Sequence, residues 1–149
     1  MTLNELFLKQ NFIKAILLKD EDSELSKELK VKIVGLRVKM AKIRKDFDEE
    51  IQEVVNNLKP QELDKLSRKS DKTEDETKQL QDMINKLNAE YLEYVNRRCL
   101  EEINFEASFT EDELNEIIQV NASNDVVING NKLSAADFLE TLYTLFIAE

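Results

Sequence analysis

The sequence predicts a mainly α-helical fold, and three observations lead to that prediction. The chain has 149 residues with only 2 Gly and 1 Pro, too few for the many turns of a sandwich or a doubly wound fold. Charged residues make up 35% of the chain, which is typical of long solvated helix faces. The third observation is an unbroken stripe of apolar residues at helical spacing: Leu25, Leu29, Ile33, Leu36, Met40, Ile43, Phe47, Ile51, Val54 and Leu58.

That stripe defines the longest predicted helix. Its positions recur about every 3.67 residues, close to the undistorted α-helix and unlike the seam of a left-handed coiled coil. We expect Ser23 to cap its start and Pro60 to end it near Lys59, because proline disfavours helical geometry in the residue before it. Such a helix is roughly 50 Å long at 1.5 Å per residue. It should therefore project from a compact body or be covered by partners.

The N-terminal segment is predicted to form a shorter helix before the long one. Thr2 and Glu5 have the spacing of a capping box, which marks a helix start. The apolar pattern continues to about Leu18, and the charged residues 19–22 then interrupt it. We expect this helix to be covered on more than one side, because its apolar residues exceed a single stripe.

A helical hairpin is predicted for the middle of the chain. Pro60 can open a short helix over residues 60–66, and residues 67–75 contain no apolar residue. Thr73 and Glu76 form a second capping box, from which a further helix runs to about Leu100. Because the link is short and polar, this helix should pack antiparallel to the long one.

After Leu100 the pattern predicts a small α+β cap. Apolar and polar residues alternate near 103–109, as in a short strand. Thr110 and Glu113 form a third capping box and open a short helix. Three apolar residues followed by Asn-Gly predict a tight hairpin near 126–132, and Ser134 then caps a last helix.

These elements together predict a single domain over residues 1–149. The hairpin occupies about 23–101 and has its polar tip at about 60–75, while the cap occupies about 103–149. The fold class is therefore mainly α: a long antiparallel hairpin with short terminal helices and a small α+β cap.

The composition argues against an enzyme. The chain has no His, which excludes His-based catalytic triads, proton shuttles and His-ligated metals. Its single Cys99 cannot form an internal disulfide, and its apolar surroundings favour a buried small residue over a reactive thiol. The N-terminus does not resemble a signal peptide, and no apolar run approaches the ~20 residues of a membrane span. We expect a protein that is made in a reducing cytoplasm and contacts no membrane.

Two groups of carboxylates resemble parts of metal sites, but each lacks other ligands that such a site needs. Asp20, Asp22 and Glu24 resemble the start of a calcium loop, but Leu25 and Val31 occupy the positions that need Gly and Glu. The acidic residues between 46 and 53 need convergent carboxylates from a second helix, and a solvated face explains them more simply. We predict no catalytic residue, cofactor or metal.

The charge is unevenly distributed, and one basic surface is a candidate contact face. Residues 1–72 carry 16 basic and 14 acidic side chains, whereas residues 73–149 carry 5 and 17. The members of this candidate contact face are Lys27, Lys30, Arg37, Arg44 and Lys45. It would either contact nucleic-acid phosphates, or be a solvated face or pair with the acidic second half of this chain or of a neighbour. The net charge of −10 and the lack of an aromatic residue for base stacking argue against contact with nucleic acid.

The last helix offers a second candidate surface. Apolar residues cover nearly all of its faces, so it forms either the core of the cap or a seam with another molecule. The residues assigned to this candidate apolar interface are Phe138, Leu142, Leu145, Phe146 and Ile147.

The order of elements resembles small proteins of tailed bacteriophages that are encoded among structural and morphogenesis genes. A short helix containing residues 11–16 (NFIKAI) is followed by a polar break and a long Lys/Arg-rich helix. A polar tip, a Glu-rich helix, a strand leading into a short helix and a final helix after residues 130–136 (GNKLSAA) complete the order. The resemblance implies a virion or assembly context, and so a location in the virion or the host cytoplasm. It assigns no residue a chemical role.

The leading hypothesis is a non-enzymatic helical structural or assembly protein. It would act through protein–protein contacts in a bacteriophage particle, as a homo-oligomer or with other virion proteins. The alternative is a regulatory or packaging protein that binds nucleic acid with the basic helix 27–45.

Overall fold

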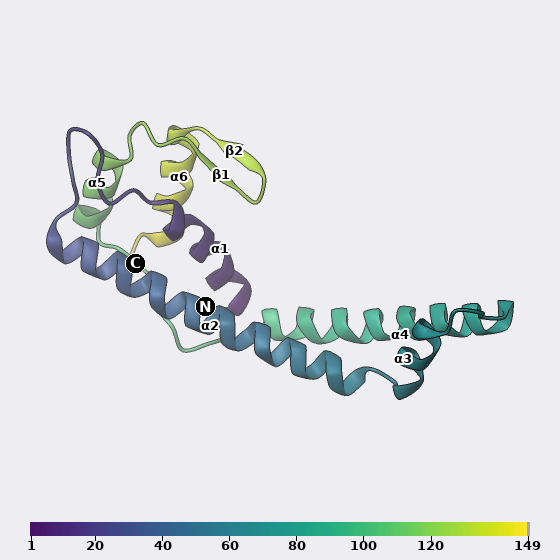
Figure 1. Cartoon of the computed structure of the whole chain (residues 1–149). Helices are drawn as coiled ribbons and strands as arrows, with labels where there is room; N and C mark the ends of the chain where they lie inside the picture. The colour runs from purple at the N-terminus through teal and green to yellow at the C-terminus, as the bar shows by residue number, and fades with distance from the viewer. Residues whose placement is uncertain (149) are drawn as a thin grey trace. The chain divides into compact units, whose positions relative to one another are not determined.

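The computed structural model describes residues 1–148 and confirms the mainly helical fold class (Figure 1). Helices hold most of the described residues, and one small antiparallel sheet accompanies them. In chain order the elements are α1 (Leu3–Ala15), α2 (Lys27–Leu58), α3 (Gln61–Arg68), α4 (Glu74–Cys99), α5 (Glu111–Val120), β1 (Val126–Ile128), β2 (Asn131–Leu133) and α6 (Ala135–Phe146).

The chain forms two compact units. The first unit contains Met1–Arg44 and the chain from Glu102 onward, and the second contains Lys45–Glu101. The second unit ends where the predicted hairpin ends, but the first part of α2 belongs to the first unit. The assignment of a single domain stays a prediction.

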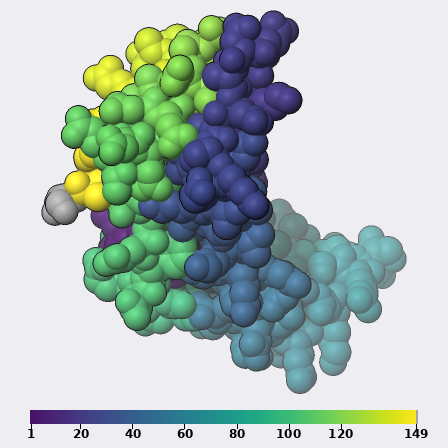
Figure 2. Space-filling model, turned by 90° about the vertical axis from the view of Figure 1, so that its left-hand side faces the viewer, coloured from purple at the N-terminus to yellow at the C-terminus, as the bar shows by residue number. Residues whose placement is uncertain are grey.

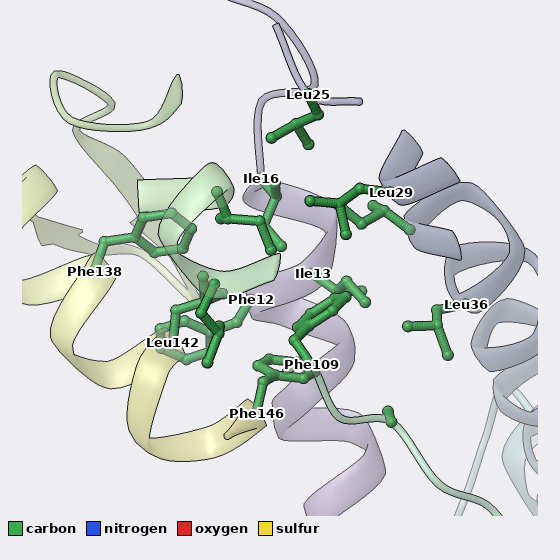
Figure 3. Close-up of a cluster of buried hydrophobic side chains, with 14 of the residues drawn as sticks. Phe12, Ile13, Ile16, Leu25, Leu29, Leu36, Phe109, Phe138, Leu142 and Phe146 are labelled. Atoms are coloured by element: carbon green, nitrogen blue, oxygen red, sulfur yellow. The ribbon is translucent and has the colours of Figure 1, made fainter. Parts of the chain in front are cut away.

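The first unit has a continuous hydrophobic core, drawn in part in Figure 3. The apolar faces of α1, α5 and α6 and the first half of α2 meet there, as amphipathic helices must to remove apolar surface from water. Phe12 of α1 stacks on Phe138 of α6 with ring centroids 5.9 Å apart. Phe109 lies against Phe146 with the rings tilted by 43° and their centroids 5.3 Å apart. Aromatic pairs at these distances add to the stabilisation from burial alone.

The three capping boxes form as predicted, but the start of α2 differs from the prediction. Ser23 does not cap it; the Ser23 hydroxyl donates to Asp20, whose carboxylate organises the preceding turn. Such local hydrogen bonds compete with helix formation. The helix begins at Lys27, and Ser26 Oγ accepts a hydrogen bond from Leu29 N at 3.3 Å. The cap is therefore Ser26, three residues later than predicted.

Helix α1 ends at Ala15, before the predicted end at Leu18, because Asn121 binds the following backbone. The fully buried Asn121 side chain accepts from Leu17 N at 2.8 Å and donates to Leu17 O at 3.1 Å. Asn124 donates to Ala15 O at 2.9 Å. These bonds replace helical ones and satisfy backbone groups that burial would otherwise leave unpaired.

The α+β cap has one hairpin, and the expected strand near 103–109 is only extended chain. Its pairing is limited to single bridges, one of them between Phe109 and Ile147. Strands β1 and β2 pair antiparallel, and the predicted Asn129-Gly130 turn joins them with φ of 52° and 78°. Asn-Gly favours this turn because both residues tolerate positive φ.

The second unit has little interior. Its part of α2, helix α3 and helix α4 bury only Phe47 and Leu63, and α4 has no buried residue. Its best-defined contact is polar: Glu50 accepts from Arg98 Nε at 2.7 Å and from the Tyr94 hydroxyl at 3.0 Å. The predicted helical hairpin is thus present and is joined near its base by an ion-pair cluster.

Candidate protein-binding face

The predicted basic face does not exist as one surface, because three of its five members contact the first unit itself. Arg37 is half-buried and donates to Ile13 O at 3.1 Å and to Ile16 O at 2.5 Å. These carbonyls lie at the C-terminal end of α1, where backbone oxygens lack helical partners and a cation is favourable. Burial lowers the pKa of Arg37 below its ordinary value, but the group stays charged at neutral pH.

Lys30 and Arg44 are also engaged within the first unit. Lys30 Nζ donates to Glu24 at 2.8 Å, and the Arg44 guanidinium lies over the Phe7 ring, 4.4 Å from its centroid. Of the predicted basic residues, Lys27, Arg44 and Lys45 are exposed, and Lys45 belongs to the second unit. The seven-residue spacing of Lys30, Arg37 and Arg44 therefore reflects a row that holds α2 to its neighbours.

The predicted apolar interface on α6 is mostly interior. Phe138, Leu142 and Phe146 are fully buried in the first unit, so they have no surface to present to another molecule. Leu145 and Ile147 are half-buried against the same core. Helix α6 therefore contributes to the core of the cap, which was the alternative interpretation of its apolar residues.

A different apolar surface stands out on α2, on the side opposite the core. Val31, Val34 and Val38 are 65%, 45% and 64% exposed, at spacings of three and four residues that place them on one helix face. Ala41 continues the row and is exposed as well. We call these four residues the valine face. Because large apolar side chains in a row are uncommon on a monomer's surface, such a row indicates a binding site.

Gly35 and three lysines border the valine face. A Cβ placed on Gly35 would meet nothing within 4 Å, so the helix is open to close approach there. Lys27, Lys39 and Lys42 are exposed around the row, and the single acidic residue between 27 and 45 is Glu28. The surface is therefore an apolar centre with a basic surround.

The core side of α2 holds this face in a fixed orientation. Leu29, Ile33, Leu36 and Met40 are buried in the first unit. Ser26 N donates to Glu116 at 2.9 Å and Lys32 Nζ to Glu113 at 2.8 Å, which ties the start of α2 to α5. Figure 2 shows the dark blue start of α2 on the surface beside the light green α5. A side chain on the far side of α2 is thereby presented on a rigid support.

The longest apolar stripe of the sequence predicts only the buried side of α2 and gives no sign of the valine face. Once Leu29, Ile33 and Leu36 are assigned to the core, valines at positions 31, 34 and 38 must point away from it. A second apolar row on one helix was the signal that could have revealed it.

The other chemical features of the described residues have structural explanations. A hollow of about 570 Å³ in the first unit includes Lys9, Phe105 and Ile147, but Lys9 Nζ already donates to Ala107 O at 3.0 Å. Burial lowers the pKa of Lys9, and no acidic group of the hollow binds its amine in the structure. Cys99 is half-buried.

The acidic residues of α2 include Glu50, whose partners lie on α4. Within residues 1–148, no three potential ligands of the His, Cys, Asp and Glu types converge. Glu50 instead pairs with Arg98, whose hydrogen bond lowers the pKa of that carboxyl. No helix in the same range combines the length and the apolar character needed to cross a membrane.

Comparisons of the chain with protein-family models, with curated proteins and with solved structures find no match. Because no similar protein indicates a function, the proposal below is based on the valine face and the lysines around it.

Proposed function

We propose that this protein is a non-enzymatic helical structural or assembly protein that acts by binding other proteins. The valine face carries the proposal: it is an exposed apolar row on a helix whose opposite side is anchored in the core. Burying those side chains against a partner would stabilise the complex by about 25 cal/mol for each Å² of apolar surface removed from water.

The proposed context is a bacteriophage particle or its assembly. The support is the order of elements described above, which resembles small proteins encoded among phage structural and morphogenesis genes. The partners in this proposal are further copies of the chain or other virion proteins.

The same surface weighs against nucleic-acid binding through helix 27–45. A nucleic-acid backbone is recognised mainly by cationic side chains and hydrogen-bond donors. The valines at the centre of this face can form neither kind of contact with a phosphate. Arg37 is engaged with backbone carbonyls of the first unit, and Lys30 with Glu24. A protein surface with an apolar centre matches the valine face better.

Site-specific photo-crosslinking in the native host tests the proposal. A benzophenone amino acid replaces Val34 at the centre of the face, and in a control protein it replaces the exposed Gln119 of α5. We expect adducts with a particle protein or another copy from position 34 above the background at position 119. Adducts with nucleic acid alone, or equal protein adducts at both positions, would contradict the proposal.

A further inference from the structure

The valine face has the spacing of a helix-packing seam. Val31, Val34, Val38 and Ala41 follow steps of three, four and three residues, as the a and d positions of a coiled coil do. These positions span about 15 Å of helix at 1.5 Å per residue, or roughly three turns. Small and β-branched side chains, with Gly35 beside them, let a second helix approach closely. The shape therefore fits a helix lying along α2.

The charges around the seam exclude pairing of two valine faces. Between residues 27 and 45 eight basic side chains accompany one acidic side chain, Glu28. In a parallel pair Lys27 would face Lys27, and in an antiparallel pair it would face the basic end of the other helix. Like charges placed across a helix interface cost free energy and act against that pairing.

No other helix within residues 1–148 presents the complementary surface. The large apolar residues exposed outside the valine face are scattered: Leu8, Leu17, Leu92, Leu100 and Val127. None of them forms a row along a helix, although α5 and α6 carry acidic residues. Helix α4 carries acidic residues and an apolar row, but apart from Leu92 that row is half-buried within the chain. Within residues 1–148, a second copy therefore exposes no apolar row between acidic flanks.

We infer that the valine face binds an amphipathic α-helix of another protein, with an apolar seam and acidic flanks. The apolar centre supplies affinity, and Lys27, Lys39 and Lys42 select the acidic flanks and favour one orientation. This inference rests on the proposed function and specifies the partner of the same surface.

Binding of designed peptides to the full chain tests the inference. The probe is a synthetic three-heptad helical peptide with Leu and Ile in its seam and Glu on its flanks, followed by fluorescence anisotropy. The control peptide has the same seam and Lys on its flanks. We expect the Glu-flanked peptide to bind at least about tenfold more tightly, and to weaken between about 50 and 500 mM NaCl.

Two equally exposed valines distinguish peptide binding at the valine face from nonspecific hydrophobic binding. Val38 on the face and Val127 on β1 are 64% and 63% exposed, so Val38→Gln and Val127→Gln remove equal apolar surface. Val38→Gln should weaken binding of the Glu-flanked peptide several-fold, and the triple variant with Val31→Gln and Val34→Gln at least tenfold. Val127→Gln should leave it unchanged. Circular dichroism must show equal helicity and thermal midpoints for all variants.

A charge reversal tests the role of the lysines. Lys27→Glu with Lys42→Glu should transfer the preference from the Glu-flanked to the Lys-flanked peptide, with the seam still required. Retained preference for the Glu-flanked peptide would overturn the assigned flanks, as would equal binding of poly-glutamate, which has acid but no seam.

Other outcomes separate this inference from the proposed function. Equal binding of both peptides, or unchanged binding by the triple valine variant, overturns the inference, while protein adducts at position 34 would still support a protein-binding role. Self-association of the native chain that the triple variant abolishes would identify a second copy as the occupant and overturn it as well. Absence of both peptide binding and protein adducts would contradict both proposals.

Discussion

The first half of α2 carries two apolar rows that the structure treats in opposite ways. Ile33 and its neighbours on one side are buried among α1, α5 and α6, whereas the adjacent Val34 and its row lie in water. Both rows have helical spacing, so periodicity alone cannot distinguish them. The difference teaches that one helix can serve folding with one face and binding with the other, and that burial identifies which face does which.

Truncating adjacent residues should give the largest contrast between the faces. Ile33 is fully buried and Val34 is 45% exposed. Ile33→Ala should lower the free energy of unfolding by about 2–4 kcal/mol, because it leaves a cavity in the core. Val34→Ala should change it by less than about 0.5 kcal/mol. Urea titrations of both variants measure the two values, and similar losses would show that the valine face also serves the fold.

The basic residues of α2 should divide in the same way. Arg37→Met removes the donor to Ile13 O and Ile16 O and should cost about 1–3 kcal/mol in unfolding free energy. Lys42→Met removes an exposed lysine and should fall within about 0.5 kcal/mol of zero. Thermal unfolding of the two variants compares them directly. An equal effect would mean that Lys42 has a structural role.

Substitution of Gly35, beside the valine face, should raise the free energy of unfolding, whereas the substitutions above lower it or leave it nearly unchanged. Nothing lies within 4 Å of an added Cβ, and alanine is the better helix former. Gly35→Ala should therefore raise the free energy of unfolding by about 0.5–1 kcal/mol. Chemical denaturation checks the increase, and a loss of stability would indicate that the site is already covered within the chain.

The smallest expected effect is a pH dependence of the ion pair between Lys30 and Glu24. The hydrogen bond and charge of Lys30 hold the pKa of Glu24 below its ordinary value in the folded protein. The stabilisation is therefore complete above the ordinary carboxyl pKa of about 4.3 and is lost as pH falls through the lowered one.

Glu24→Gln should accordingly show a slightly smaller loss of stability between about pH 5 and pH 3 than the native chain. Urea midpoints across that interval measure the loss. Adding Lys30→Met to Glu24→Gln should change the slope no further, because the pair is already broken. A steeper slope in Glu24→Gln would contradict the sign of the shift.

Local signals made most of the fold predictable. The capping boxes at Thr2, Thr73 and Thr110 are confirmed because each depends on residues within one turn. The buried stripe of α2 is confirmed from Leu29 to Met40 because burial follows helical periodicity. Asn-Gly likewise fixed the turn of the hairpin.

The details that depend on distant residues were not predictable in this way. The end of α1 is set by Asn121, more than a hundred residues away in the chain, and the role of Arg37 by carbonyls of another helix. The α6 interface was wrong in its buried members, because an all-round apolar helix is equally compatible with a core and a seam. The valine face required knowing which apolar row the core had taken.

The most direct test of the account is methyl NMR of the labelled full chain during addition of the Glu-flanked peptide. The account predicts that the methyl signals of Val31, Val34 and Val38 shift with increasing peptide, while those of Ile33 and Val127 stay in place. Shifts that spare the three face valines, or that are as large at Val127, would contradict the claim that the outer side of α2 is a binding face.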